Sequence, residues 1–262
     1  MDNINLYAQL QALSSLNDDS TVVSSRKQLN EIVSIFKQRE EYLEEVTWFA
    51  DLARNLKVET LLECDSFMLQ PYIPVTLLPA DLRHDSLGFC KGSTYVFEGR
   101  YVYPVKDVKG DVMGFCGYDK FSEAKYLDSL NYGYRAKSYS LWGMEKLPEY
   151  YRSDEPVYFV EGIVCALYLR QEGLQALATL GSIISPYVTE IIRRFGSRAI
   201  MVNDSDEAGT KCKRTMIHRI PRLRCVQSRI AKDVDDSRLV DDRFVEELRK
   251  FKNPFYRCDL IK

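Results

Sequence analysis

Several features that mark common classes of protein are missing from this sequence. No stretch of about 18 apolar residues occurs, which argues against a membrane-spanning helix. The opening segment, MDNINLYAQL, lacks a basic stretch followed by an apolar core, so we expect no secretory signal. No G-x-x-x-x-G-K-[ST] phosphate loop is present, so we expect no fused ATP-driven helicase.

Paired cysteines and histidines are also scarce. The seven cysteines are scattered singly and none forms a C-x-x-C pair, so a zinc ribbon is not expected. An odd, dispersed set of cysteines is typical of reduced thiols in the cytosol. The two histidines, His84 and His218, leave little room for histidine-based catalysis.

Charge of both signs is abundant, but it is unevenly distributed. The net charge of the 262 residues is only −2, yet the segment from Ala208 to Lys232 contains lysines and arginines and no acid. A basic block inside an acidic protein indicates a phosphate-bearing partner. A solvated helix face is the alternative interpretation of the same block.

The hydrophobic pattern changes twice along the chain. Apolar residues recur at helical spacing in the N-terminal part, whereas TYVFEGRYVYPV and VKDVKGDVMGFCGY are typical of strands joined by glycine turns. The C-terminal part alternates strand and helix patterns. We therefore predict a helical N-terminal region over residues 1–85, a mixed α+β basic subdomain over 86–150, and an α/β domain over 151–262.

The α/β domain is expected to hold a parallel sheet flanked by helices, because alternating strands and helices form such sheets. The predicted strands cover residues 157–160, 176–180, 199–203 and 223–227. The predicted helices cover residues 162–172, 186–195, 207–219 and 241–251.

Acidic residues follow three of the predicted strands where each strand ends. They are Glu161 after VYFV, Asp204 and Asp206 after AIMVN, and Asp233 and Asp235 in AKDVDD after LRCVQ. The carboxyl ends of parallel strands share one edge of a sheet, where ligands bind, so we expect these acids to gather there. Because like charges repel, the pattern predicts a divalent cation, Mg²⁺ or Mn²⁺, shared with substrate phosphates.

The segment DSDEAG also has a purely structural interpretation. An aspartate at a helix start accepts hydrogen bonds from the first backbone N–H groups and interacts favourably with the helix dipole. The presence of VEG and KDVDD, in order after other strands, favours the metal site.

Taken together, FVEG, VNDSDEAG and AKDVDD resemble the three signatures of the Toprim fold. That fold occurs in DnaG-type primases, type IA and type II topoisomerases, and some nucleases. The resemblance implies that Glu161 takes part in acid/base or metal chemistry, with Asp204 and Asp206 also at the catalytic centre. It implies magnesium binding by Glu161, Asp204, Asp206, Asp233 and Asp235.

The region before these motifs resembles bacterial DnaG-type primases in particular. RYVYPVKDVKGDVMGFCGYD resembles the segment that precedes Toprim in that family. AKYLDS and RAKSYSLWGM resemble P-K-Y-L-N-S and H-K-x-x-x-L-Y-G-L, which place basic residues that handle nucleic acid and nucleotide at Lys125 and Lys137. The similarity covers about residues 97–240. Two positions depart from the family pattern, since Cys165 stands in place of a frequent acid and Tyr118 in place of an arginine.

The resemblance implies a DNA primase core that makes short RNA primers on single-stranded DNA from ribonucleoside triphosphates by metal-dependent nucleotidyl transfer. The residues expected to bind nucleic acid or nucleotide are Arg100, Lys125, Lys137, Lys211, Lys213 and Arg214. Some aromatic side chains offer stacking faces for bases, although most are expected in the core: Tyr95, Tyr101, Tyr118, Tyr126 and Trp142.

Partners and location follow from the same resemblance. With neither zinc-binding domain nor helicase, the sequence suggests a phage or mobile-element replication protein in the cytosol of a bacterium or phage-infected host, with a replicative helicase acting in trans. Two other functions remain open: a Toprim nuclease that uses the same acids for cleavage, and a non-catalytic primase-like module that holds DNA or a replication partner. A topoisomerase is not expected, because the chain is too short for strand-passage domains.

Overall fold

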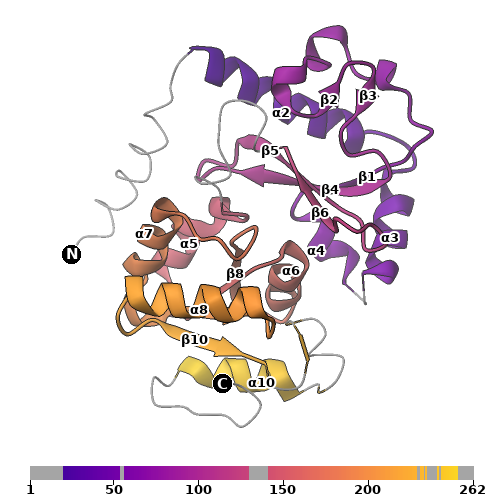
Figure 1. The fold of residues 1–262 in the computed structure, drawn as a ribbon. Coiled ribbons are helices and arrows are strands. Elements are labelled where there is room, and N and C mark those ends of the chain that lie inside the picture. The colour runs from indigo at the N-terminus through magenta and orange to yellow at the C-terminus, as the bar shows by residue number, and fades with distance from the viewer. Residues whose placement is uncertain are drawn as a thin grey trace. The chain divides into compact units, whose positions relative to one another are not determined.

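Two four-stranded sheets organise the part of the chain that the structure describes (Figure 1). The structure is a computed structural model that describes residues 20–53, 56–129, 141–228, 231–232, 234, 241 and 243–252. These residues fall into two units, one up to residue 140 and one from residue 141 on. The division into three parts at residues 85 and 150 stays a prediction. No helix within the described residues is long and apolar enough to cross a membrane.

The sheet of the N-terminal unit is antiparallel, with the strand order β1-β4-β5-β6. Its strands are β1 (Phe67–Leu69), β4 (Arg100–Lys106), β5 (Val112–Tyr118) and β6 (Tyr126–Asp128). The predicted hairpin is confirmed, since β4 and β5 pair on either side of a turn in which Gly110 has a φ of 91°. The Asp107 carboxylate holds this turn by accepting hydrogen bonds from the backbone N–H groups of Lys109 and Asp111.

Helices surround this sheet, together with short 3₁₀ segments and a small hairpin. The helices are α2 (Ser20–Lys37), α3 (Tyr42–Leu52) and α4 (Val58–Leu62). The 3₁₀ segments are Val75–Leu77, Ala80–Leu82 and Asp85–Leu87, and the hairpin pairs β2 (Cys90–Lys91) with β3 (Thr94–Tyr95). Strand β1 comes from the region predicted to be helical. All three of its residues are buried, which explains why it pairs with β4 instead of continuing a surface helix.

Stacked aromatic rings fill the core of the N-terminal unit. Phe36 on α2 stacks on Phe67 of β1 with ring centroids 4.6 Å apart, and Phe49 on α3 stacks on Tyr101 of β4 at 3.6 Å. Such pairs stabilise a core beyond the effect of buried area alone. Helix packing against this sheet therefore depends on aromatic side chains spread over more than 60 residues of sequence.

The C-terminal unit has the predicted parallel sheet, with the strand order β10-β9-β7-β8. Its strands are β7 (Val157–Val160), β8 (Gln175–Ala178), β9 (Ala199–Asn203) and β10 (Arg224–Gln227). Its helices are α5 (Leu147–Arg152), α6 (Ile163–Gln171), α7 (Pro186–Arg194), α8 (Glu207–Arg219) and α10 (Arg243–Arg249). Its 3₁₀ segments are Met144–Lys146, Gly196–Arg198 and Lys250–Lys252. The predicted bounds of β7, β9 and α8 are confirmed to the residue.

Burial explains why this sheet could be predicted. All residues of β7 and β9 are buried, as is typical of parallel strands that are covered on both faces. Helix α6 packs against β7 and β8, while α8 packs against β9 and β10. Trp142 extends the sheet through an isolated antiparallel bridge to Ala178 on β8.

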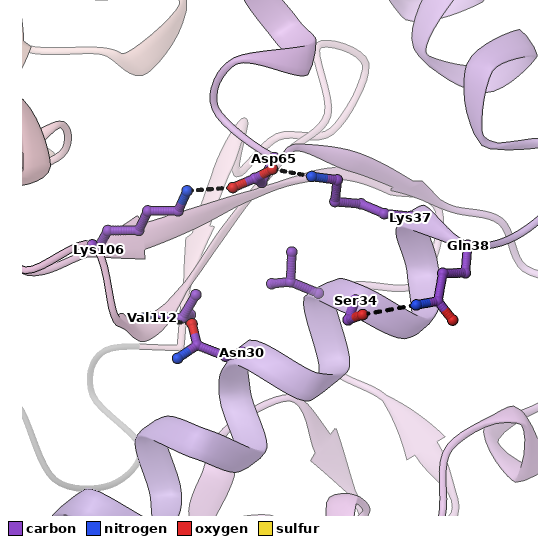
Figure 2. Close-up of a pocket in the computed structure, with 9 residues that line it drawn as sticks. Asn30, Ser34, Lys37, Gln38, Asp65, Lys106 and Val112 are labelled. Carbon is purple, nitrogen blue, oxygen red and sulfur yellow. Dashed lines mark hydrogen bonds and ion pairs between the residues drawn. The ribbon is translucent and has the colours of Figure 1, made fainter.

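Three charged side chains close a polar pocket in the N-terminal unit (Figure 2). Lys37 at the end of α2 and Lys106 at the end of β4 each donate to a different carboxylate oxygen of Asp65. The pocket has a volume of about 450 Å³ and is also lined by Asn30 and Val112. Asp65 has a φ of 57°, a left-handed conformation that aspartate and asparagine tolerate better than most residues. The ion pairs thus join α2, β4 and the segment before β1.

Replacing Asp65 with asparagine tests this junction, because asparagine keeps the size and tolerates the left-handed backbone while the charge is lost. Two partly buried lysines then lack a counter-charge, so the free energy of unfolding should fall by about 1–2 kcal/mol at pH 7. Although burial raises the pKa of Asp65, hydrogen bonds from Lys106 and Lys37 hold it below its ordinary value.

Because this pKa is lowered by folding, the stabilisation is complete above about pH 5 and is lost as the pH falls through about 4 toward the folded pKa. Urea denaturation of both proteins between pH 7 and pH 3 measures the effect. A difference between wild type and Asp65→Asn that is independent of pH contradicts the assignment.

Candidate functional site at the carboxyl edge of the parallel sheet

Glu161 directly follows β7, and the chain after β8 fixes its backbone. The Glu161 carbonyl accepts a hydrogen bond of 3.1 Å from the N–H of Leu180, and the Val160 carbonyl accepts one of 2.8 Å from Thr179. Leu180 is buried and has a φ of 59°, an unusual conformation for a residue with a branched side chain. Strained backbone of this kind persists only where surrounding contacts enforce it, and it is common at functional sites.

Asp204 directly follows β9, and Gly209 of helix α8 lies against its backbone. A Cβ atom on Gly209 would lie 2.1 Å from the Asp204 carbonyl oxygen, so only glycine fits here. The same carbonyl accepts a hydrogen bond of 2.8 Å from Nε2 of Gln227 at the end of β10. Gln227 in turn accepts a hydrogen bond of 3.4 Å from Nζ of Lys213. The backbone of Asp204 is therefore held by both α8 and β10.

Asp206 is the N-cap of α8, as the structural interpretation of DSDEAG predicts. One carboxylate oxygen accepts a hydrogen bond of 2.8 Å from the Gly209 N–H, and the other lies 3.4 Å from Nζ of Lys232. The hydrogen bond from Gly209, followed by the interactions with Lys232, lowers the pKa of Asp206. Asp206 is thus ionised at neutral pH, and one of its oxygens faces a cation on the exposed side of the loop.

Ser205 connects the Asp204–Asp206 turn to the loop that carries the third acidic pair. Its N–H donates to the Lys232 carbonyl over 2.6 Å, and its hydroxyl donates to the Ser228 carbonyl over 2.5 Å. Lys232 immediately precedes Asp233 in the sequence. Asp233 and Asp235 themselves lie outside the described residues. The loop between β10 and these two acids is therefore bonded to the turn that bears Asp204 and Asp206.

The Glu161 carboxylate interacts electrostatically with the Cys212 thiol of α8. Burial and then the charge of Glu161 raise the pKa of the Cys212 thiol to about 11, whereas a hydrogen bond with Asn203 lowers it. The thiol is therefore neutral at physiological pH. Asn203, Cys212 and Glu161 come from β9, α8 and the end of β7, so the edge of the sheet brings together the residues that surround the predicted centre.

The donor atoms at this edge suit a hard divalent cation, since they are carboxylate oxygens. Among the residues that the structure describes, no group of three His, Cys, Asp or Glu side chains lies close enough to form a metal cluster. Two of the five predicted ligands are outside that part of the chain. Metal binding by Glu161, Asp204 and Asp206 stays a prediction. Cys165, which replaces a frequent acid, is buried in α6.

The three cations predicted on α8 differ in their environment. Lys211 and Arg214 are exposed and lie three residues apart, which places them on neighbouring positions of one helix face. Lys213 instead donates to Gln227, the residue that holds the Asp204 carbonyl. Lys211 and Arg214 are thus available to phosphate, whereas Lys213 supports the backbone of the acidic turn.

The predicted cations of the N-terminal unit differ in the same way. Lys125 is exposed in the loop between β5 and β6. The Arg100 guanidinium donates to Ser122 Oγ over 3.1 Å and to the Ala124 carbonyl over 3.0 Å, so it supports that loop. Lys137 lies outside the described residues.

Most of the aromatic residues considered for base stacking are core residues. Tyr95, Tyr101 and Trp142 are buried. Tyr118, which replaces an arginine of the family pattern, is half-buried with its ring centroid 4.9 Å from that of Tyr126. Tyr126 retains 38% exposure, so it is the member of this set with an accessible face.

Sequence comparison relates the chain to DNA primases. It is 28% identical over 131 residues to the DNA primase of Legionella pneumophila, a match that covers 48% of this chain and 23% of the relative. It is 32% identical over 112 residues to the DNA primase of Borreliella burgdorferi, covering 42% of this chain and 21% of the relative. The matches therefore span about a fifth to a quarter of the length of these curated relatives. No protein-family model matches the chain.

Solved structures share the fold over most of the chain. A DnaG primase catalytic domain bound to single-stranded DNA superposes with a TM-score of 0.71 at 18% identity, covering 90% of this chain and 80% of that one. The zinc-binding and RNA polymerase domains of the Aquifex aeolicus primase superpose with a TM-score of 0.71 at 21% identity, covering 91% and 62%. The predicted α/β class, with a parallel sheet flanked by helices, is confirmed, because the chain has the fold of the DnaG catalytic core.

Gly209→Ala should destabilise the C-terminal unit, although alanine normally stabilises a helix relative to glycine by about 1 kcal/mol. The added Cβ meets backbone atoms of Asp204, which cannot rotate away. We expect the free energy of unfolding to fall by about 2–4 kcal/mol in urea denaturation. The exposed Thr215→Ala change in the same helix is the control and should alter it by no more than about 0.5 kcal/mol. Equal stabilities of the two variants contradict the close approach.

A pair of substitutions at Asp206 separates its capping role from its charge. Asparagine caps helices as well as aspartate does, whereas alanine does not cap, so Asp206→Ala should cost about 1 kcal/mol and Asp206→Asn a few tenths. Thermal denaturation of the two variants measures this order. Equal losses of stability in both variants show that the charge next to Lys232, and not the cap, stabilises this turn.

Proposed function

We propose that this chain is the core of a DnaG-like DNA primase, which makes short RNA primers on single-stranded DNA by metal-dependent nucleotidyl transfer. Its substrates are ribonucleoside triphosphates and its template is a single strand. A replicative helicase acting in trans is a further proposed partner, and the bacterial or phage-infected host cytosol is the proposed location.

One observation carries this proposal. Acidic residues follow β7 and β9 at the carboxyl edge of the parallel sheet, and Ser205 bonds the second of these turns to the loop that leads to Asp233. Ligands bind at this edge of open α/β sheets. The DnaG catalytic-core fold and the similarity to DNA primases support primer synthesis as the chemistry for such an edge.

Each group at the edge has a role that its environment supports. Glu161 accepts the proton of the attacking 3′ hydroxyl or holds a cation, since a carboxylate is the acceptor present at the end of β7. Asp204 and Asp206, together with Asp233 and Asp235, would hold Mg²⁺ or Mn²⁺. When bound, such a metal neutralises the phosphates of the incoming nucleotide and favours loss of pyrophosphate. Lys232, which is paired with Asp206, would have to give way to such a cation.

In this proposal, lysine and arginine side chains of each unit contact phosphate groups. Lys211 and Arg214 lie on the helix that begins at Asp206, so their exposed side chains suit the triphosphate or the product strand. Lys125 offers a cation in the N-terminal unit, and Lys137 is proposed for the same role from the family pattern. Contacts of this kind supply most of the affinity for a single strand and weaken with salt.

Primer synthesis on single-stranded DNA, with labelled ribonucleotides and Mg²⁺ or Mn²⁺, tests the proposal. Asp204→Asn and Asp206→Asn should each lower the rate at least about 100-fold, because transition-state charge then lacks its counter-ions. Glu207→Gln is the matched control, since Glu207 is an exposed acid one residue beyond Asp206 and should leave the rate within about twofold.

Other outcomes of the same assay identify the alternatives. Metal-dependent cleavage of the template by wild type, lost in Asp204→Asn, indicates a Toprim nuclease. Template binding by wild type without any synthesis indicates a non-catalytic module. This last function is favoured by one observation, the ion pair of Asp206 with Lys232, which occupies a predicted metal ligand. Synthesis at the wild-type rate by the Asp204→Asn, Asp206→Asn double variant excludes the proposed centre.

A further inference from the structure

The loop between β5 and β6 presents an aromatic ring to solvent. Phe121 is 77% exposed, which makes it the most exposed aromatic side chain among the large hydrophobic residues that the structure describes. Tyr126, at the start of β6, is 38% exposed. An isolated exposed apolar residue needs no explanation, but this ring lies in a loop with other features that point to a ligand.

Hydrogen bonds close this loop and connect it to β4. The Asp119 N–H donates to the Lys125 carbonyl over 2.9 Å, which closes the loop at its two ends. The Phe121 N–H donates to Asp119 Oδ1 over 2.8 Å and so fixes the backbone that bears the ring. Arg100 precedes the loop in the sequence, and its guanidinium donates to Ser122 Oγ and to the Ala124 carbonyl.

These hydrogen bonds affect the free energy of ligand binding by the loop. A loop that is already fixed loses little conformational entropy when a ligand docks, so the contacts of its exposed ring contribute more fully to affinity. Arg100 donates from β4, a strand in the middle of the sheet, and thus ties the loop to the rigid part of the unit. The loop thus presents the Phe121 ring to solvent, where covering it with a ligand would remove apolar surface from water.

The charges beside the ring suit a polyanion with flat bases. The Lys120 ammonium lies 5.3 Å from the Phe121 ring centroid and donates a hydrogen bond of 3.3 Å to the Leu52 carbonyl. Lys125 is exposed four residues after Phe121. Glu123 is exposed in the same loop, while the Asp119 carboxylate is occupied by the Phe121 N–H. Aromatic faces next to cations are the means by which proteins bind single-stranded nucleic acid without sequence preference.

We propose that Phe121 is a stacking platform for a base of single-stranded nucleic acid, with Lys125 contacting the adjoining phosphate. This inference rests on the proposed function and assigns a further residue to template binding. Tyr126 extends the platform, because its partly exposed ring directly follows Lys125. A protein partner on the same ring is the competing explanation, and it predicts no change in DNA affinity when the ring is removed.

Binding of a fluorescein-labelled oligothymidylate, measured by anisotropy over a range of salt concentrations, tests the platform. Phe121→Ala should weaken binding by about 5- to 150-fold, because one base loses its stacking partner. The slope of log affinity against log salt should stay unchanged, since no phosphate contact is lost. Lys125→Ala should instead reduce that slope by about 0.7, the value for one phosphate of a single strand.

Three further variants make the test specific. Tyr72→Ala removes another aromatic residue of the same unit, 71% exposed, and should bind like wild type. Phe121→Trp should retain binding, and its added fluorescence should be quenched by the bound strand when the signal is compared with wild type. Phe121→Leu keeps apolar area without a π face and should bind nearly as weakly as Phe121→Ala.

The outcomes separate this inference from the proposed function. If wild type binds the oligonucleotide and Phe121→Ala binds equally well, the platform is wrong while the primase proposal stands. Full binding by Phe121→Leu, or a changed salt slope in Phe121→Ala, also overturns base stacking. If wild type binds no single strand at low salt, the proposed function is wrong because the template does not bind. The stacking platform is then wrong as well.

Discussion

The rest of the candidate site depends on the close approach of helix α8 to the end of strand β9. Gly209 allows the first turn of α8 to lie against the Asp204 carbonyl, where any side chain would collide with backbone. That carbonyl then accepts from Gln227, and Ser205 bonds to the Ser228 and Lys232 carbonyls. Strand β9, helix α8 and the chain after β10 are thereby fixed to one another. The positions of the acids in this turn follow from backbone geometry.

Two of the acids at this edge, Asp206 and Glu161, lie beside groups that limit the build-up of negative charge. Asp206 is stabilised by the N–H groups at the start of α8 and by Lys232, which together lower its pKa. The Cys212 thiol remains neutral beside Glu161, so it adds no further charge at the edge. The contact between Asp206 and Lys232 is exposed to solvent. Under the proposed function, this exposed contact is where a cation shared with a triphosphate would reach Asp206.

Basic residues near the predicted sites fall into two groups. Some hydrogen-bond to the protein and hold nearby loops in place, and others are exposed to solvent. Arg100 and Lys213 donate to carbonyl and amide oxygens of the protein, and they hold the Lys125 loop and the Asp204 turn in place. Lys125, Lys211 and Arg214 remain exposed. The planar guanidinium of arginine suits the first role, because it can donate to several oxygens at once. The two groups have the same charge and differ only in which atoms surround them.

The sequence by itself determined the parallel sheet, the bounds of β7, β9 and α8, and the resemblance to primases, because buried parallel strands and amphipathic helices leave strong periodic patterns. It also indicated both roles of DSDEAG without deciding between them. Only the tertiary structure decided that Asp206 caps α8, that Ser205 and Gln227 join the strand ends, and that β1 completes the antiparallel sheet. It likewise decided that Arg100 supports a loop that presents Phe121. These outcomes depend on contacts between residues far apart in the chain. The spacing of residues along the sequence does not show which atoms make such contacts.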